Sequence, residues 1–131
     1  MESNYLALLG LARRAGMLEI GDESARVALQ SKKARVLLMA SDASDRTKDT
    51  FTFIAESCEV PYVEVSETRE ELGNALGKRP CAAVAVCDIG FASAIIKKLS
   101  EHNEAAALVA GEIISRAEKS AARRKASKQK K

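Results

Sequence analysis

The sequence predicts an α/β protein, a single-domain three-layer α/β/α sandwich around a central mixed sheet. Two segments, "ARVLLMAS" at 34–41 and "CAAVAVC" at 81–87, are apolar almost throughout, as in strands that are covered on both faces. Segments with helical periodicity alternate with these strands, and such alternation favours helices on both faces of one sheet. A chain of 131 residues is long enough for one domain with a substantial core.

The first half of the chain supplies three predicted helices and one strand. The first helix is expected to start near Ser3 or Asn4 and to end at Gly16, a residue type favoured just after a helix. A second helix follows, with acids in its first turn, where the helix dipole favours them. After a strand near residues 35–40, Ser44 is expected to cap a third helix whose apolar positions recur at helical spacing.

The second half repeats the pattern of strand and helix. A strand is predicted near residues 62–65. Thr68 and Glu71 then fit the capping-box pattern of a helix that ends at Gly77. The apolar strand near residues 82–87 leads into another amphipathic helix.

Residues 1–102 are expected to form the domain, and residues 103–131 a further helix followed by a basic tail. The segment from Ser120 onward has no apolar residue other than Ala, so it is expected to lack regular structure by itself.

The charge of the chain is divided unevenly. From Arg116 onward eight Lys and Arg residues face one acid, a charge of +7, whereas residues 1–115 carry 13 Lys and Arg against 17 Asp and Glu, a charge of −4. A neutral-to-acidic body with a basic tail favours a polyanionic partner such as nucleic acid. Such tails also serve only as solubilising ends, and this alternative stays open.

No segment indicates a membrane protein, a secreted protein or a metal site. No apolar run approaches the roughly 20 residues that span a bilayer. The basic pair near the N-terminus follows the apolar stretch, the reverse of a signal peptide, so we expect a cytoplasmic protein. Cys58, Cys81, Cys87 and the single histidine, His102, lack the spacing of metal ligands. We therefore expect buried thiols, no metal and no cofactor.

Candidate catalytic groups are few, and the protein is not expected to be an enzyme. Asp42 and Asp88 each follow an apolar strand, where ligands often bind, and two such acids could hold Mg²⁺ as in a receiver module. Capping or turn formation is the simpler interpretation of both. The chain has no G-x-S-x-G nucleophile motif and no glycine-rich segment with the spacing of a phosphate loop.

The start of the second helix carries the most informative polar cluster. Asp22 and Glu23 offer acceptors for the N1–H and N2–H₂ groups of guanine, and Arg26, about one turn on, can donate to a base edge or a phosphate. Together they would form a compact site for unpaired or non-Watson–Crick guanines in RNA. The simpler interpretation is a pair of dipole-complementing acids with an ion pair worth about 0.3 kcal/mol, and chemistry alone favours it.

Five segments in order resemble the kink-turn RNA-binding superfamily of small ribosomal proteins, the L7Ae and L30e type, and within it the bacterial YlxQ-like branch. The resemblance runs from Tyr5 to about Leu99. It includes "LARRAG", "GDESAR" in place of Gly-x-Asn-Glu-x-x-Lys, and "ARVLLMASDAS" against an apolar strand that ends in Ala-x-Asp. "CEVPYVEV" and "ELGNALGKRPCAAVAV" match the family segments Cys-Glu…Val-Pro-Tyr and Leu-Gly-x-Ala-x-Gly.

This resemblance implies the sandwich fold described above and non-catalytic binding of sharply bent RNA. It implies RNA contacts from the start of the second helix, from the corner after the following strand and from the loop before the last strand. By matching position these are Asp22, Glu23 and Arg26, then Ser44 more weakly, then Lys78, Arg79 and Pro80. Arg69 matches a position that is often basic and faces phosphate.

The chain departs from the family pattern at two places. Asp22 stands where the family has Asn, which replaces an NH₂ donor with a negative charge near phosphates. Lys78 and Arg79 stand in the loop where the family has an aliphatic residue that covers a flipped-out base.

The predicted function is therefore recognition of structured RNA of kink-turn type, through sheared G·A pairs, by a monomer associated with ribosomal or other structured RNA. No small-molecule substrate is expected. The alternative is a protein-interaction module on the same fold that has lost RNA binding, since the body of the protein is acidic. A receiver-like or nucleotide-handling enzyme centred on Asp42 and Asp88 is the third possibility.

Overall fold

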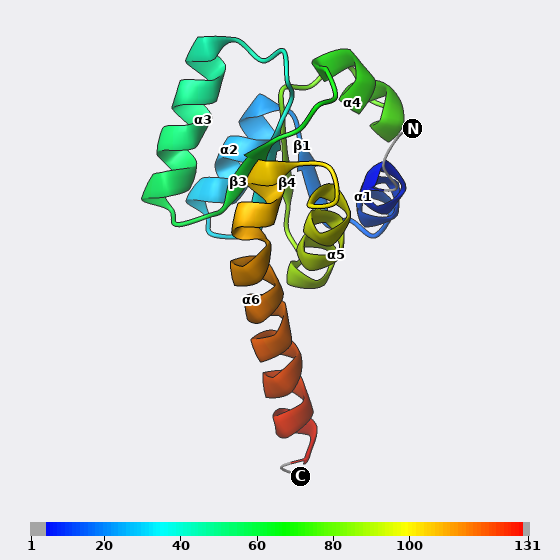
Figure 1. Ribbon diagram of the computed structural model, residues 1–131, viewed down its shortest axis with the longest axis vertical. Helices are drawn as coiled ribbons and strands as arrows, with labels where there is room; N and C mark the ends of the chain where they lie inside the picture. The colour runs from blue at the N-terminus through cyan, green and yellow to red at the C-terminus, as the bar shows by residue number, and fades with distance from the viewer. Residues whose placement is uncertain (1–4, 130–131) are drawn as a thin grey trace.

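The computed structural model of the protein describes residues 5–129, with side chains through Arg124, and these residues form six helices and a four-stranded sheet (Figure 1). The strands lie in the order β1-β4-β2-β3, with β4 antiparallel to both of its neighbours and β2 parallel to β3. The predicted α/β sandwich with a mixed sheet is confirmed. The elements in chain order are α1 (Tyr5–Arg14), β1 (Leu18–Ile20), α2 (Asp22–Gln30), β2 (Val36–Met39), α3 (Asp45–Ser57), β3 (Tyr62–Glu64), α4 (Arg69–Leu76), β4 (Ala83–Val86), α5 (Ile89–Leu99) and α6 (Glu104–Gln129).

Capping residues set the boundaries of α3 and α4 where the sequence predicts them. The Ser44 hydroxyl accepts a hydrogen bond from the backbone N–H of Thr47 at 3.1 Å. At the start of α4, Thr68 and Glu71 make both bonds of a capping box, at 2.9 and 3.1 Å. Gly77 ends α4 in the left-handed conformation, with φ of 65°. The three predicted boundaries are confirmed.

The N-terminal part contains one strand that the sequence analysis did not predict. Gly16 has φ of 75°, as expected for a residue that ends α1, whereas the predicted start of α1 at Ser3 or Asn4 lies outside the described residues. β1 follows and pairs antiparallel with β4. It has only three residues and is partly exposed, so its own sequence carries little strand pattern.

The sheet separates two apolar layers with side chains of different size. The two central strands, β2 and β4, are buried along their whole length. Val36, Leu38, Val84 and Val86 contribute to the core under α1, α4, α5 and α6, whereas Leu37, Met39, Ala83 and Ala85 contribute to the core under α2 and α3. Ala25 and Ala28 of α2 face the small side chains of β4. Small residues on both elements allow α2 to pack close to the sheet.

The last helix, α6, is part of the core at its beginning and projects beyond the domain toward its end (Figure 1). Ala106 and Ile113 are fully buried in the core under α5, and Val109 and Ala110 pack against it. Although α6 has 26 residues, neither it nor any other helix in the described part of the chain is long and apolar enough to cross a membrane.

The predicted tail without regular structure differs from the structure, because α6 continues past Ser120 to Gln129. Ala, Arg, Lys and Gln dominate this segment and are among the best helix formers, and the buried first turns supply the nucleus that isolated helices lack. Only residues 130–131 of the predicted tail lie outside the described residues.

A glycine in α4 allows the loop before β4 to pack directly on that helix. A β-carbon on Gly73 would lie 2.5 Å from the carbonyl oxygen of Arg79 and 2.9 Å from that of Lys78. The backbone N–H of Lys78 also donates to the carbonyl of Gly73 at 2.8 Å, and that of Cys81 donates to Arg69 at 3.2 Å. The backbone of residues 77–81 is therefore held against α4 by contacts that leave no room for a methyl group.

Gly73→Ala should lower the free energy of unfolding by about 1–3 kcal/mol, because the new β-carbon would overlap the backbone of Arg79. Gly10→Ala in α1 is the matched control. Open space surrounds that position, so the better helix propensity of alanine should raise stability by roughly 0.5–1 kcal/mol. Urea unfolding of the wild type and both variants measures these shifts, and stabilisation by both substitutions would contradict the close contact at Gly73.

Ile113→Ala should lower the free energy of unfolding by about 2–5 kcal/mol, because it removes a fully buried side chain from the interface of α6 with the domain. Leu108→Ala is the control on the same helix. Its side chain is 85% exposed, so we expect a change within about 0.5 kcal/mol. If both substitutions changed the free energy of unfolding equally little, α6 would not be part of the cooperative folding unit.

Candidate nucleic-acid interface

The candidate residues are brought together by the direction of the strands. β1, β2 and β3 all end at the end of the sheet where β4 begins, because β4 runs antiparallel to β1 and β2. Backbone hydrogen bonds join the loops there. Gly21 N–H donates to Ala83 at 3.0 Å, and Ala40 N–H donates to Ala82 at 2.9 Å. The start of α2, the corner after β2, the start of α4 and the loop before β4 therefore share one end of the molecule, the upper end in Figure 1.

The start of α2 presents Asp22 and Glu23 on its exposed first turn. Gly21, with φ of 102°, makes the turn from β1 into the helix, and no side chain caps the helix there. Arg26 Nη2 lies 3.1 Å from Glu23 Oε1, and the two side chains are 44% and 77% exposed. The ion pair that the simpler interpretation predicts is present. It is worth only a few tenths of a kcal/mol at this exposure, so both side chains are available to another partner.

The corner after β2 is tied to the start of α4 through Asp42. Its Oδ1 accepts from the backbone N–H of Arg69 at 2.8 Å and lies 3.7 Å from Arg69 Nε. The Ser44 hydroxyl donates to the Thr47 hydroxyl at 3.0 Å in addition to capping α3. Ser44 is therefore occupied by the helix start, whereas Arg69 keeps an exposed guanidinium beside the corner.

Asp42 and Asp88 have the capping and turn roles that the sequence favours. Asp88 caps α5 by accepting from Phe91 N–H at 2.9 Å. Because β4 is antiparallel to β2, Asp88 lies at the opposite end of the sheet from Asp42. Among the described residues, no group of three His, Cys, Asp or Glu side chains is placed to hold a metal ion.

The loop before β4 presents Lys78, Arg79 and Pro80 to solvent, while its backbone packs on α4. Neither Lys78 nor Arg79 makes an ion pair with any residue that the structure describes. Burial raises the pKa of the Cys81 thiol, and the carboxylate of Asp22 raises it further. The hydrogen bond from Gly21 N–H to the carbonyl of Ala83 places Asp22 near the end of this loop, so the start of α2 and the loop before β4 lie at the same place on the molecule.

Of the three predicted buried thiols, only Cys81 is fully buried. Cys58 and Cys87 are partly exposed, and all three thiols are free. The prediction of buried thiols is therefore wrong for two of the three.

A cavity of about 370 Å³ extends the interface from α2 onto α3. Asp22 and Arg26 line one wall, and Arg46, Thr47 and Thr50 of α3 line the other. None of the three residues of α3 is among the contacts predicted from the sequence. The position of Arg46 could have indicated a binding role. A cation in the first turn of a helix is disfavoured by the helix dipole, which suggests that Arg46 has another function.

Comparison with known proteins identifies the family of the chain. The sequence pattern of the ribosomal protein L7Ae/L30e/S12e/Gadd45 family matches residues 3–96. A Bacillus subtilis (strain 168) protein named "RNA-binding protein YlxQ" is 36% identical over 95 residues, which are 72% of this chain and 94% of that protein. The protein of the same name from Enterococcus faecium is 35% identical over 85 residues, 65% of this chain and 81% of its own.

Two solved structures share the fold. One, described as a protein with unknown function from Bacillus halodurans C, superposes with a TM-score of 0.70 at 32% identity and covers 76% of this chain and 99% of its own. The Giardia lamblia 15.5kD RNA binding protein gives a TM-score of 0.60 at 20% identity, over 73% of this chain and 84% of its own, and is similar in fold. α6 begins beyond the residues that the family pattern matches. The chain belongs to the ribosomal protein L7Ae/L30e/S12e/Gadd45 family.

Proposed function

We propose that the protein binds structured RNA of kink-turn type, as a non-catalytic cytoplasmic monomer that associates with ribosomal or other structured RNA. The observation that carries the proposal is the adjacency of two surfaces. The acceptors of Asp22 and Glu23, with Arg26 beside them, lie at the same end of the sheet as the exposed cations of Lys78 and Arg79, where Gly21 N–H donates to the carbonyl of Ala83. The two relatives named as RNA-binding proteins support the same function.

The first of these surfaces has the chemistry to read guanine. A carboxylate only accepts hydrogen bonds, and guanine offers N1–H and N2–H₂ donors on the edge that sheared G·A pairs leave accessible. The exposed Glu23–Arg26 ion pair can open at little cost, after which Glu23 accepts from a base and Arg26 donates to a base edge or a phosphate.

The surrounding cations can bind the phosphate backbone of the RNA. Arg46 lines the same cavity as Asp22, while Arg69, Lys78 and Arg79 lie at the same end of the sheet, and all four are exposed. Contacts of such side chains with phosphates position a protein on nucleic acid without reading its sequence. In this proposal Lys78 and Arg79 stack on or pair with the flipped-out nucleotide that an aliphatic residue covers in the family, and Pro80 limits the freedom of the loop.

A protein-interaction module is the alternative, and the acidic body of the chain is what favours it. RNA binding that depends on Glu23 and Arg26 separates the two functions. A protein-interaction module that has lost RNA binding would have no affinity for RNA that substitutions at Glu23 and Arg26 could weaken.

Glu23→Ala and Arg26→Ala should each weaken binding to a kink-turn RNA by about 1–3 kcal/mol, the value of one base-edge contact. Both side chains are substantially exposed, so the free energy of unfolding should change by less than about 0.5 kcal/mol. Fluorescence anisotropy with a kink-turn RNA and a straight duplex measures affinity and discrimination. Glu104→Ala and Lys97→Ala, exposed and outside the interface, are charge-matched controls. Variants that bind like wild type would show that this surface does not read RNA.

Asp22→Asn should tighten binding to the kink-turn RNA, because it removes a negative charge near phosphates and supplies the NH₂ donor that the family residue has. Asp49→Asn, an exposed acid on α3, makes the same change of charge outside the interface and should have a smaller effect. The same titrations compare the two variants. Weaker binding of Asp22→Asn would mean that the carboxylate is itself the acceptor that the RNA of this protein requires.

A further inference from the structure

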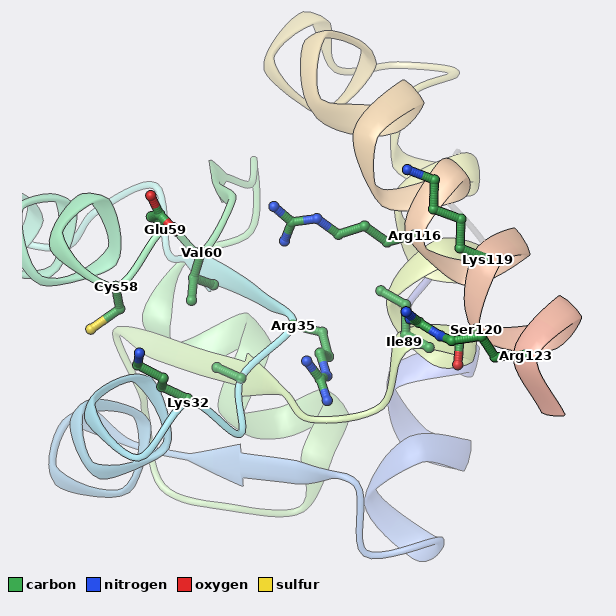
Figure 2. Close-up of a pocket in the computed structure, with 11 residues that line it drawn as sticks. Lys32, Arg35, Cys58, Glu59, Val60, Ile89, Arg116, Lys119, Ser120 and Arg123 are labelled. Atoms are coloured by element: carbon green, nitrogen blue, oxygen red, sulfur yellow. The ribbon is translucent and has the colours of Figure 1, made fainter. Parts of the chain in front are cut away.

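A second basic surface lies at the opposite end of the sheet from the candidate interface. It is a groove of about 370 Å³ between α6 and the loops that follow α2 and α3. Figure 2 shows Arg116 and Arg123 extending from α6 toward the side of the groove where Arg35 lies. Lys32 and Lys119 complete the basic lining, and Glu59 is the one acid among the residues that line the groove.

The wall formed by α6 continues the helix face that packs on the domain. Steps of three and four residues lead from the buried Ala106 and Ile113 to Arg116, Ser120 and Arg123. The face is apolar where it covers the core and basic where it passes the end of the sheet. α6 also lies beyond the part of the chain that the family pattern matches, so this wall is an addition to the family domain.

The opposite wall is fixed in position by the backbone. Arg35 N–H donates to the carbonyl of Val86 at 2.7 Å, which joins the start of β2 to the end of β4. Lys32 and Glu59, the residues after the ends of α2 and α3, have φ of 64° and 58°, a conformation that residues with a β-carbon rarely adopt. The residues that line both sides of the groove thus lie on a helix or directly beside the ends of helices and strands.

The cations of the groove are only partly compensated. Arg116 pairs with Glu112 on its own helix, and Glu56 and Glu59 line the same surface depression as these two residues. Lys32, Arg35, Lys119 and Arg123 make no ion pair with any residue that the structure describes. Several unpaired cations that line one groove raise the local positive potential and attract polyanions.

We infer that this groove binds the phosphates of a second segment of the RNA that the candidate interface recognises. The inference rests on the proposed function and extends it. Long, exposed Lys and Arg side chains without fixed partners suit a chain of phosphates rather than a single small anion held by buried donors. Asp22 and Lys32 are ten positions apart at the two ends of α2, a separation of roughly 15 Å, which a strand of several nucleotides spans.

The test compares a groove variant with a charge-matched control. Arg35→Ala/Lys119→Ala/Arg123→Ala removes three groove cations, whereas Arg13→Ala/Arg14→Ala/Lys97→Ala removes three exposed cations that neither line the groove nor belong to the interface. Two RNAs are titrated at several salt concentrations. One is a kink-turn RNA with stems of a full helical turn on each side, and the other is the same internal loop with its stems trimmed to a few base pairs.

With the long RNA, the groove variant should lower the slope of log K against log salt by about 2–3, since each of the three lost phosphate contacts removes roughly 0.7–0.9. The control should lower it by much less, and the trimmed RNA should not distinguish the two variants. Discrimination between kink-turn and straight RNA should stay unchanged in both. Cys58, which lines the groove and is partly exposed, should also be alkylated more slowly in the presence of the long RNA.

Two results would overturn the inference without touching the proposed function. They are equal salt slopes for the two variants while wild type binds RNA, and a groove that binds an oligo-glutamate peptide while the long RNA leaves Cys58 unprotected. Wild type that bound neither RNA would overturn the proposed function and this inference together.

Discussion

β4 lies between β1 and β2 and runs antiparallel to both. The positions of the candidate interface and of the basic groove depend on this arrangement. At one end of the sheet its start meets the ends of three strands, and the hydrogen bonds from Gly21 to Ala83 and from Ala40 to Ala82 hold the loops together. At the other end its last residue, Val86, accepts from Arg35 and so fixes a wall of the basic groove. A parallel β4 would have divided both sets of residues between the two ends.

The same strand also determines which helices approach closely. Its alanines face α2 and its valines face α1 and α5. α2 therefore packs near the sheet without large side chains between them, and the direction of α2 follows that of the strand beneath it. The first turn of α2 lies at the candidate interface and its last turn lies beside the basic groove, so that a single helix connects the two surfaces.

Much of the fold could be predicted from the sequence because its signals are local. The apolar runs of β2 and β4 identify buried strands, and the capping residues Ser44 and Thr68 identify helix starts. β1 could not be predicted in this way, because three partly exposed residues become a strand only through pairing with a segment far along the chain. The continuation of α6 past Ser120 does not follow from composition, because it depends on helix propensity and on the buried turns that precede it.

In the candidate site, too, local features could be predicted from the sequence and contacts between distant segments could not. The placement of Glu23 and Arg26 on one helical turn follows from their spacing, and so does the ion pair between them. The cavity that joins Arg26 to Arg46 depends on how α2 packs beside α3, which no local pattern states. Likewise the groove exists only because α6 continues straight past the loops that carry Arg35 and Glu59, a matter of register between distant segments.

The packing of the loop before β4 on Gly73 has an evolutionary consequence. The loop is held through its backbone, by the carbonyls of Lys78 and Arg79 and by a helix position without a β-carbon, and not through its side chains. Side chains at positions 78 and 79 are therefore nearly uncoupled from folding, and drift at these positions meets little purifying selection for stability. A glycine at position 73 thus permits substitutions at positions 78 and 79, and new specificities can arise in this loop while the scaffold beneath it stays the same.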